Sequence, residues 1–308
     1  MKIYEYSEEM HVDFSAAVVA LGLFDGVHKG HQALLSIAKK KAEKLKIPLV
    51  VFTFFSENEL PKGVTRLYST EVKSELLQRA GADFIVYADF RKIAGYEAED
   101  FVRDIIINKL GARLAVTGTD FRFGKNRAGD TKLLAEIMQS FGKAALLVPD
   151  EIISETKIST SLIKELLKNG DTRLASELLG EPYFIEGEIV HGDSRGETLG
   201  LPTVNISLQS DKSFIKLGVY QSAVEIDGKS YTGLTNIGRC PTFKEREVHA
   251  ETFILDFSEN VYGKRARVAL IDYLREEKKF KNKDELTEQI QKDIASVKER
   301  QKNVRHME

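Results

Sequence analysis

Two histidines three residues apart lie in a glycine-rich segment near the beginning of the chain. The segment runs from Gly22 to His31 and reads Gly-Leu-Phe-Asp-Gly-Val-His-Lys-Gly-His. Glycine lets a backbone turn sharply and approach a ligand closely. With Gly30 between them, His28 and His31 can face one phosphate, where two imidazoles would stabilise the charge that develops during attack on the α-phosphate of a nucleotide. The spacing therefore suggests nucleotide chemistry.

The chain on either side of this segment favours the same interpretation. An apolar run at 16–21 precedes it and an amphipathic stretch at 32–45 follows it, which together indicate a strand, a turn and a helix. The N-terminus of a helix offers unpaired N–H groups to an anion. A glycine-rich turn is also common between strands and helices of any function, and a lone histidine is often filler, so the prediction rests on the whole combination.

A second glycine-rich segment, from Gly187 to Asn205, lies in the other half of the chain. Its glycines predict a loop whose N–H groups can surround a polyphosphate. Thr203 and Asn205 are two residues apart, so in a strand they point to the same face. Their oxygens would suit a magnesium ion carried by ATP, because Mg²⁺ prefers oxygen ligands and few protein donors. A polar pair on a solvated face is the alternative, and spacing alone does not choose between them.

Up to about residue 180, short apolar segments alternate with amphipathic ones. This pattern indicates a doubly wound parallel sheet with helices on both faces and a ligand at the carboxyl ends of the strands. The predicted strands are Val18–Leu21, Leu49–Phe54, Phe84–Tyr87, Leu114–Thr117 and Ala144–Val148. The predicted helices are His31–Leu45, Thr70–Ala80, Ala98–Leu110, Thr131–Phe141, Thr160–Lys168 and Thr172–Leu179.

After a short linker at 180–182 the pattern changes to β. Asp227-Gly228 between two apolar runs is a strong signal for a two-residue hairpin. About six strands in so short a stretch predict a small closed barrel. A final helix from about Asp284 to Arg300 has an apolar stripe suited to packing against that barrel. The predicted strands lie near Tyr183–Val190, Val204–Ile206, Val219–Ile226, Ser230–Thr235, Glu251–Phe257 and Arg265–Tyr273, and the stripe consists of Leu286, Ile290, Ile294 and Val297.

The composition is that of an ordinary intracellular enzyme. The 308 residues suffice for two domains, and 42% hydrophobic and 30% charged residues exclude a disordered chain. A net charge of −2 gives no electrostatic reason to expect nucleic acid or membrane as a partner. Cys240 is the single cysteine, so no internal disulfide forms. With neither a basic signal-peptide region nor a long apolar run, we expect a cytoplasmic location.

The segment Gly22–His31 resembles the HxGH signature of the nucleotidyltransferase superfamily. Its fuller form, GxFDGxHxGH, resembles the adenylyltransferase half of the bacterial bifunctional riboflavin kinase/FMN adenylyltransferase family, also called FAD synthetase. Residues 117–124, reading TGTDFRFG, and 157–164, reading KISTSLIK, resemble further elements of that half. The resemblance implies catalytic roles for His28 and His31. It also implies an ATP site of Gly22, Phe24, Asp25, Gly30, Lys157, Thr160, Ser161 and Lys164, and a flavin site of Asp120, Phe121, Phe123 and Asn126.

Each of these later segments also has a plain structural interpretation. Hydroxyls at a helix start cap backbone N–H groups in any protein, so Thr160 and Ser161 are equally expected as caps. Phe121 and Phe123 are equally expected as buried core residues, and both roles can hold at once because such aromatic rings could line an isoalloxazine pocket.

The second glycine-rich segment resembles the flavokinase signature, a glycine-rich loop leading into PTxN. Further family-like segments follow in order at 218–220, 236–243, 251–257, 262–263 and 274–280. The resemblance places Thr203 and Asn205 at the metal and Arg275 at the flavin. It makes Glu251 the general base for the ribityl hydroxyl, where an exposed strand glutamate is the alternative. It also implies a kinase ATP site of Gly187, His191, Gly192, Gly196, Gly200 and Pro202.

The chain departs from the family pattern at three places in its first half. The family usually has an Asp-Pro-His-Pro-like segment after Thr53-Phe54, where this chain reads Phe-Ser-Glu-Asn. The usual Ser-Thr order is exchanged at 160–161, and Lys164 replaces an arginine, which keeps the charge but loses the planar guanidinium fork. We expect FAD formation to persist, more slowly or with weaker FMN affinity.

The resemblance implies an α/β nucleotidyltransferase-like domain at 1–180, followed at 181–308 by a flavokinase-like six-stranded barrel with a C-terminal helix. The expected function is phosphorylation of riboflavin to FMN and adenylylation of FMN to FAD, with ATP as the phosphate and AMP donor and Mg²⁺ as the metal. The alternatives are a riboflavin kinase with a degenerate first domain and a non-catalytic flavin-binding regulator. Riboflavin, FMN and ATP are the expected binding partners.

Overall fold

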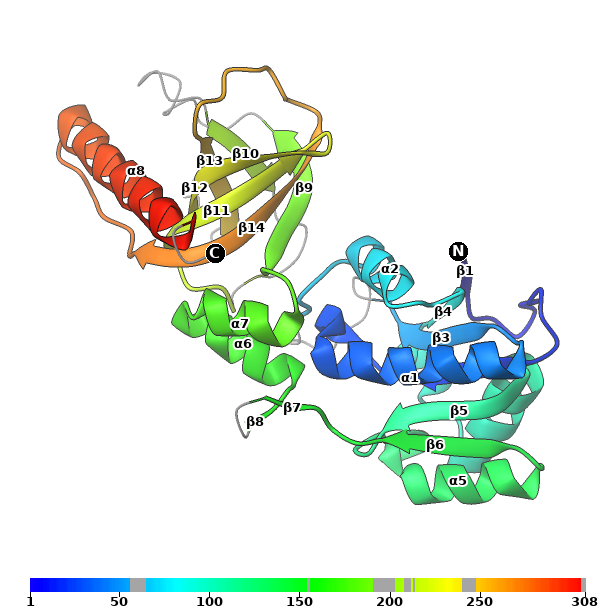
Figure 1. Cartoon of the computed structure of the whole chain (residues 1–308). Coiled ribbons are helices and arrows are strands. Elements are labelled where there is room, and N and C mark those ends of the chain that lie inside the picture. The colour runs from blue at the N-terminus through cyan, green and yellow to red at the C-terminus, as the bar shows by residue number, and fades with distance from the viewer. Residues whose placement is uncertain are drawn as a thin grey trace. The chain divides into compact units, whose positions relative to one another are not determined.

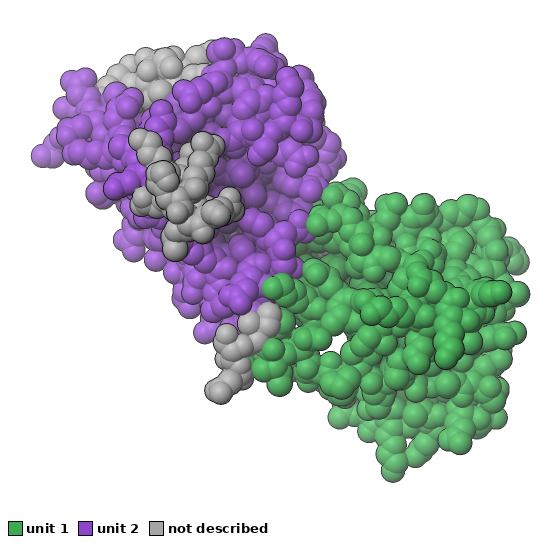
Figure 2. Space-filling model, in the orientation of Figure 1, with its two compact units in different colours: residues 1–160 green, residues 161–308 purple. Residues whose placement is uncertain are grey.

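A computed structural model describes residues 1–55, 65–153, 156–190, 203–207, 212, 214–239 and 248–305. The chain divides into two compact units, residues 1–160 and residues 161–308 (Figures 1 and 2). This division falls twenty residues before the domain boundary that we predicted at 180/181. Within the described residues, no helix is both long and apolar enough to span a bilayer.

The N-terminal unit, residues 1–160, is built on one parallel sheet of six strands. The strands are β1 (Lys2–Glu5), β2 (Ala17–Leu21), β3 (Leu49–Phe54), β4 (Phe84–Ala88), β5 (Ala112–Gly118) and β6 (Ala144–Val148), in the order β1-β4-β3-β2-β5-β6. The five predicted strands are all present. The order reverses between β2 and β5, and in open parallel sheets ligands bind at the carboxyl ends beside such a reversal.

Helices cover both faces of this sheet (Figure 1). α1 (Lys29–Leu45) packs against β2, β3 and β5. A π-helix (Phe101–Lys109) and α5 (Thr131–Ser140) pack on the opposite face, where their apolar side chains share one core with Val19 and Phe52. The remaining α-helices are α2 (Thr70–Arg79), α3 (Phe90–Ile93) and α4 (Ala98–Asp100), and short 3-10 helices lie at Asp25–Val27 and Lys125–Arg127. β7 (Ile152–Ile153) pairs with β8 (Thr156–Lys157). The expected α/β architecture is confirmed.

The C-terminal unit, residues 161–308, contains a closed antiparallel barrel. Its six strands are β9 (Phe184–Val190), β10 (Thr203–Ser207), β11 (Gly218–Ile226), β12 (Lys229–Arg239), β13 (Val248–Ile254) and β14 (Arg265–Arg275), in the order β10-β13-β12-β11-β14-β9. Asp227 and Gly228 join β11 to β12 with φ angles of 51° and 74°, which is the positive-φ pair of a type I′ hairpin. The six-stranded barrel and its hairpin are therefore confirmed.

The two faces of β13 carry different side chains. Its residues alternate between buried and half-buried, with Thr252 buried and Glu251 and Phe253 half-buried. The Thr252 hydroxyl lies 2.9 Å from the equally buried hydroxyl of Thr235. Phe253 instead packs with the apolar cluster formed by Leu234, Leu255, Leu274, Ile294 and Val297. Since Ile294 and Val297 belong to α8 (Lys283–Arg305), this helix covers part of the outer barrel face, as its apolar stripe predicts.

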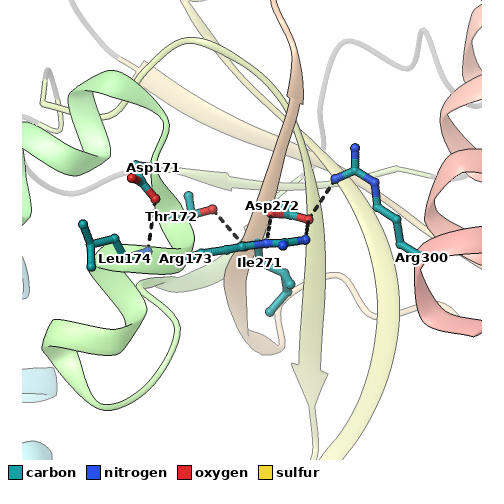
Figure 3. A network of polar contacts seen from close by, with 7 residues as sticks. All are labelled: Asp171, Thr172, Arg173, Leu174, Ile271, Asp272 and Arg300. Atoms are coloured by element: carbon teal, nitrogen blue, oxygen red, sulfur yellow. Dashed lines mark hydrogen bonds and ion pairs between the residues drawn. The ribbon is translucent and has the colours of Figure 1, made fainter. Parts of the chain in front are cut away.

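Two further helices, α6 (Thr160–Asn169) and α7 (Thr172–Leu179), belong almost wholly to the barrel unit. The Thr172 hydroxyl donates to the Ile271 carbonyl at 2.8 Å, and Arg173 makes two hydrogen bonds to the Asp272 carboxylate (Figure 3). Arg300 of α8 donates to the same carboxylate at 2.8 Å (Figure 3). These contacts hold α7 on β14, and they explain why the compact unit begins before the predicted domain boundary.

Candidate active sites

The glycine-rich turn after β2 has an unusual backbone path. Phe24 and Val27 have φ angles of 48° and 42°, and Gly26 has 81°. Positive φ is costly for residues with side chains, and strongly so for a β-branched residue such as Val27. The surrounding structure must therefore hold this turn in place.

Hydrogen bonds from three other segments fix the turn. The buried carboxylate of Asp25 accepts from the Leu67 amide at 2.9 Å, and the Asp25 carbonyl accepts from the Thr160 hydroxyl at 2.9 Å. The Thr53 hydroxyl at the end of β3 donates to the Leu23 carbonyl at 2.9 Å. Asp25 and Thr160 were both predicted to bind ATP, and in this structure they shape the turn that carries the histidines.

The two histidines are held face to face at the start of α1. Their rings stack with centroids 3.7 Å apart and 17° between the planes. His28 is the N-cap of α1, and its Nδ1 accepts from the His31 amide at 3.4 Å. An accepting Nδ1 leaves the proton of neutral His28 on Nε2, which is then a hydrogen-bond donor. A Cβ added to Gly30 would lie 3.2 Å from His28 Nδ1, so a residue without a side chain fits here.

Both imidazoles are electrically neutral at physiological pH. Burial lowers the pKa of His28 to about 4, although nearby Asp25 acts in the opposite direction. Burial also lowers the pKa of His31 well below its usual range, and electrostatic interactions with His28 and Lys73 act in the same direction. His31 Nδ1 is buried and has no hydrogen-bond partner among the described residues. Two neutral imidazoles at a helix N-terminus offer donors to an anion without becoming acids themselves.

A charged cluster lies at the carboxyl ends of β5 and β6, on the same sheet edge. Lys157 forms ion pairs with Asp120 at 3.0 Å and with Asp150 at 2.9 Å. These carboxylates raise the pKa of Lys157, with Asp150 contributing most. Lys157 and Asp120 were predicted in separate ATP and flavin sites, and here they contact each other.

The predicted flavin residues of this unit differ in exposure. Phe123 is 5% exposed and packs against Phe101 with centroids 5.6 Å apart, so it belongs to the core. Phe121 is half-buried and stacks on Phe123, while Asn126 is exposed with a φ of 55°. Phe121 is thus the accessible aromatic ring of the pair.

The barrel brings together the residues predicted for phosphoryl transfer. Thr203 Oγ1 donates to Glu251 Oε1 at 3.0 Å, across the antiparallel pair β10–β13. Asn205 is the direct register partner of Glu251 on one side, and Asn236 of β12 is its partner on the other. Register partners point to the same face, which for Glu251 is the outer face beside α8. Hydroxyl, amide and carboxylate oxygens thus form one row across three strands.

Asn236 was not given a role by sequence reasoning beyond its place in a family-like segment. Its Nδ2 donates to Glu277 Oε1 at 3.2 Å, and a Cβ on Gly238 would come within 2.5 Å of the same Glu277 oxygen. The carboxylate of Glu277 therefore lies against the backbone of Gly238, next to the row of oxygens. Only the cross-strand register shows that Asn236 and Glu251 are neighbours.

Arg275 ends β14 and is held by α8. Its guanidinium donates to both oxygens of Asp293 at 2.8–3.2 Å, and both side chains are largely buried. Gln289 donates to the same carboxylate at 2.9 Å. Asp293 thus sets the direction of the Arg275 side chain, which was predicted to bind the flavin. The spacing of residues in the sequence did not indicate this partner.

Several predicted residues of the kinase ATP site lie outside the described residues: His191, Gly192, Gly196, Gly200 and Pro202. Gly187 is described, and it is buried in β9 opposite Ala266. Ser161 and Lys164 lie on α6 in the C-terminal unit, where the Lys164 ammonium is 5.8 Å from the centre of the Phe214 ring.

Comparison with known proteins identifies both halves. The family model described as FAD synthetase matches residues 11–162, and the one described as riboflavin kinase matches residues 179–301. A Bacillus subtilis protein named bifunctional riboflavin kinase/FMN adenylyltransferase is 36% identical over 289 residues, which is 90% of each chain. The chain belongs to the bifunctional riboflavin kinase/FMN adenylyltransferase family.

Other relatives agree with this membership of the riboflavin kinase/FMN adenylyltransferase family. The Escherichia coli K12 protein of that name is 34% identical over 293 residues, covering 92% of each chain. A crystal structure from Streptococcus pneumoniae, described as a macrolide-efflux protein, is 30% identical and covers 96% of this chain and 98% of its own, with a TM-score of 0.85. The sequence similarity thus covers 92% of this chain and the structural similarity 96%.

Each of the two family models matches one of the two compact units of this chain. The FAD synthetase match ends at residue 162, near the division at 160/161, and the riboflavin kinase match begins at 179, within α7. α6 therefore lies mostly outside both matched ranges. The HxGH turn lies in the first range, and the row of Thr203, Asn205 and Glu251 lies in the second.

One buried charge near the histidines was missed by sequence reasoning. Lys73 of α2 is 4% exposed and donates to the Thr53 hydroxyl at 2.8 Å. Its position offered a signal, because Lys73, Leu76 and Leu77 share the apolar stripe of that helix. A lysine within such a stripe must bury its charge or displace the helix.

Proposed function

We propose that each unit performs one of the two reactions of the family at its own site. The barrel unit transfers the γ-phosphate of ATP to riboflavin, giving FMN and ADP. The α/β unit transfers AMP from a second ATP to FMN, giving FAD and pyrophosphate. One assembled candidate site in each unit carries this proposal: the histidine pair after β2, and the row of oxygens on β10, β13 and β12.

In the kinase reaction, Glu251 acts as the general base. The ribityl hydroxyl oxygen attacks the γ-phosphorus, its proton passes to the Glu251 carboxylate, and the bond from the γ-phosphorus to the β,γ-bridging oxygen breaks. Thr203 and Asn205 would hold a Mg²⁺ ion that arrives with ATP, and their neutral oxygens fit an ion whose other ligands are phosphate and water. That ion would neutralise phosphate charge, while Thr203 also orients Glu251 through its 3.0 Å hydrogen bond.

In the adenylyl transfer, no acid or base is required. An FMN phosphate oxygen, already an anion, attacks the α-phosphorus of ATP, and the bond to the α,β-bridging oxygen breaks to release pyrophosphate. His28 and His31 would donate hydrogen bonds to the oxygens on which negative charge develops. Neutral imidazoles suit this role, since they remain donors without losing a proton.

The kinase-only alternative requires a first unit that no longer binds phosphate. Against it stand the strained turn held by Asp25, Thr53 and Thr160, and the stacked histidines, whose buried His31 Nδ1 has no hydrogen-bond partner within the described segments. Strained turns persist only where the surrounding structure determines them. The segment at 56–58, where the chain departs from the family pattern, lies outside the described residues.

Chromatography of the products from riboflavin, ATP and Mg²⁺ tests the proposal. We expect FMN to appear first and FAD to follow from the intact chain. FMN without FAD would indicate a riboflavin kinase only, and flavin binding without ATP consumption would indicate a regulator.

We also propose that riboflavin, FMN and ATP are the ligands and that the location is cytoplasmic, which the single cysteine supports. The net charge of −2 supports the proposal that neither nucleic acid nor membrane is a partner.

A further inference from the structure

Lys73 buries an ammonium group beside the turn that carries the histidines. The residue is 4% exposed, and its Nζ donates to Thr53 Oγ1 at 2.8 Å and to the Phe54 carbonyl at 2.9 Å. Its Nζ also lies 5.5 Å from the centre of the Tyr87 ring. Burying a charged group is costly unless polar partners compensate for the lost water, so a lysine kept in this position needs a reason.

A chain of hydrogen bonds joins Lys73 to the glycine-rich turn. The Thr53 hydroxyl accepts from Lys73 and donates to the Leu23 carbonyl, so its orientation is fixed from both sides. Thr53 itself is fully buried at the carboxyl end of β3. The ammonium group is therefore hydrogen-bonded to the end of β3. This strand lies beside β2, and the turn that carries the histidines follows β2.

The charge of Lys73 also acts on His31. Burial lowers the pKa of His31 most, and His28 and Lys73 lower it further. His31 Nδ1 is buried and has no partner in the described part of the chain. Neutral donors with a fixed cation nearby give the site a positive potential without any mobile proton, and this suits an anionic ligand.

We propose that Lys73 is a positioning residue for adenylyl transfer, whose fixed charge beside the histidine turn favours the anion that develops at the α-phosphate of ATP. This inference rests on the proposed assignment of adenylyl transfer to the histidine pair. Lys73 acts through the histidines and the turn, and its effect arises from its charge more than from its hydrogen bond to Thr53.

Three substitutions in the full-length chain separate charge from hydrogen bonding. Lys73→Gln removes the charge but keeps a donor group, Lys73→Arg keeps the charge, and Thr53→Val removes the hydroxyl but leaves the ammonium group. Lys132→Gln is the matched control, because Lys132 lies on α5 of the same unit with a side chain that is 85% exposed. Each variant is assayed for FAD formation from FMN and ATP, and for FMN formation by the barrel as a control for the sample.

Lys73→Gln should lower kcat for FAD formation by about ten-fold to a hundred-fold, with a smaller change in KM for FMN, as expected when a unit charge near a developing anion is removed. Lys73→Arg should recover most of that loss, and Thr53→Val should lose less than Lys73→Gln. Equal kcat for Lys73→Gln and Lys132→Gln would overturn the inference. So would a loss in Thr53→Val as large as in Lys73→Gln, without recovery by arginine.

Two further measurements keep the test decisive. If Lys73→Gln abolishes the thermal transition of the N-terminal unit, Lys73→Arg decides: near wild-type kcat supports a role of the charge, and a loss as large as that of His28→Ala with His31→Ala contradicts it. The double histidine variant also separates the two proposals. If it forms FAD at the wild-type rate, the proposed site is wrong, whereas full activity of Lys73→Gln beside an inactive histidine variant overturns only the role of Lys73.

Discussion

His28 and His31 stack with ring centroids 3.7 Å apart, and the backbone amide of His31 donates to Nδ1 of His28. A stacked pair of imidazoles this close would repel if both were protonated. Burial resolves this by lowering the pKa of both rings, so that both stay neutral. The pair can therefore act only as hydrogen-bond donors or acceptors near neutral pH, and the chemistry assigned to it must need no proton transfer.

The neutral histidines give a first prediction, for pH. Because burial lowers the pKa of His28 to about 4, its imidazole should not take a proton between pH 8 and pH 5 in the folded chain. The unfolded chain takes that proton near its usual pKa of about 6.5. Lowering the pH from 7 to 4 should therefore favour the unfolded state, by up to roughly 3 kcal/mol for this group.

NMR titration of the imidazole resonances checks this prediction, with His28→Ala and His31→Ala to assign the signals. The His28 signal should stay at its neutral position down to about pH 5, and the His31 signal should titrate well below its usual pH range, because burial lowers both pKa values. A midpoint near pH 6.5 for either one would contradict the assignment of neutral donors.

A second prediction concerns Glu251. If its carboxylate takes the ribityl proton, Glu251→Gln should lower FMN formation by about 10²–10⁴-fold, the usual range for loss of a general base. Adenylylation of added FMN should persist, because that site is in the other unit. The matched control is Glu225→Gln, an exposed glutamate on β11 of the same barrel. Kinase turnover as high as in that control would reject the role of Glu251.

A third prediction concerns the metal. Thr203→Ala with Asn205→Ala should weaken the use of Mg-ATP by the barrel and leave riboflavin binding largely intact. Flavin fluorescence titration measures the second quantity, and the dependence of FMN formation on Mg²⁺ and ATP measures the first. Collapse of riboflavin binding with unchanged Mg-ATP affinity would show that the pair has another role.

A fourth prediction concerns Gly30, whose missing side chain makes room for His28. A Cβ at this position would lie 3.2 Å from His28 Nδ1, tighter than ordinary contact, so the imidazole must move by a few tenths of an ångström. Since displacement of about 1 Å can cost about 10²-fold in rate, we expect Gly30→Ala to slow FAD formation by about ten-fold. FMN formation serves as the internal control, and an unchanged rate of FAD formation would show that the position of His28 is not critical.

Fragment stability gives a fifth prediction. A fragment of residues 161–308 keeps the contacts of Thr172 and Arg173 with β14, whereas a fragment of residues 181–308 loses them. The longer fragment should phosphorylate riboflavin alone and melt at a higher temperature, because removal of Arg173 leaves the largely buried Asp272 with one arginine fewer. Equal melting temperatures would mean that α6 and α7 add nothing to the barrel.

Local pattern predicted the strands well where a mostly apolar run lies between turns. β3 and β6 have the predicted bounds, because such short apolar runs between turns leave little choice. β1 was missed because its four residues carry two charges and are mostly exposed. The strand predicted at Glu251–Phe257 is observed at Val248–Ile254, because the chain turns at Asp256 with a φ of 54° and ends the apolar run.

The site was predictable as motifs but not as contacts. Two residues at fixed spacing, such as His28 and His31, or Thr203 and Asn205, carry their own signal in the sequence. Pairs such as Arg275 and Asp293 join a strand to a distant helix, and nothing in local composition encodes them. The contact of Arg173 with Asp272 likewise spans 99 residues of sequence.

The most direct test of the central claim, that the histidine pair forms FAD, is FAD production from FMN, ATP and Mg²⁺ by the unmodified chain and by His28→Ala with His31→Ala. The unmodified chain should form FAD, slowly for its family because Phe55-Ser56-Glu57 stands where a histidine and two prolines are usual. The double variant should form FAD far more slowly, since losing one phosphate-facing donor alone costs about 10²–10³-fold, while its FMN formation from riboflavin continues. Equal FAD from both proteins, or none from either, would contradict the account.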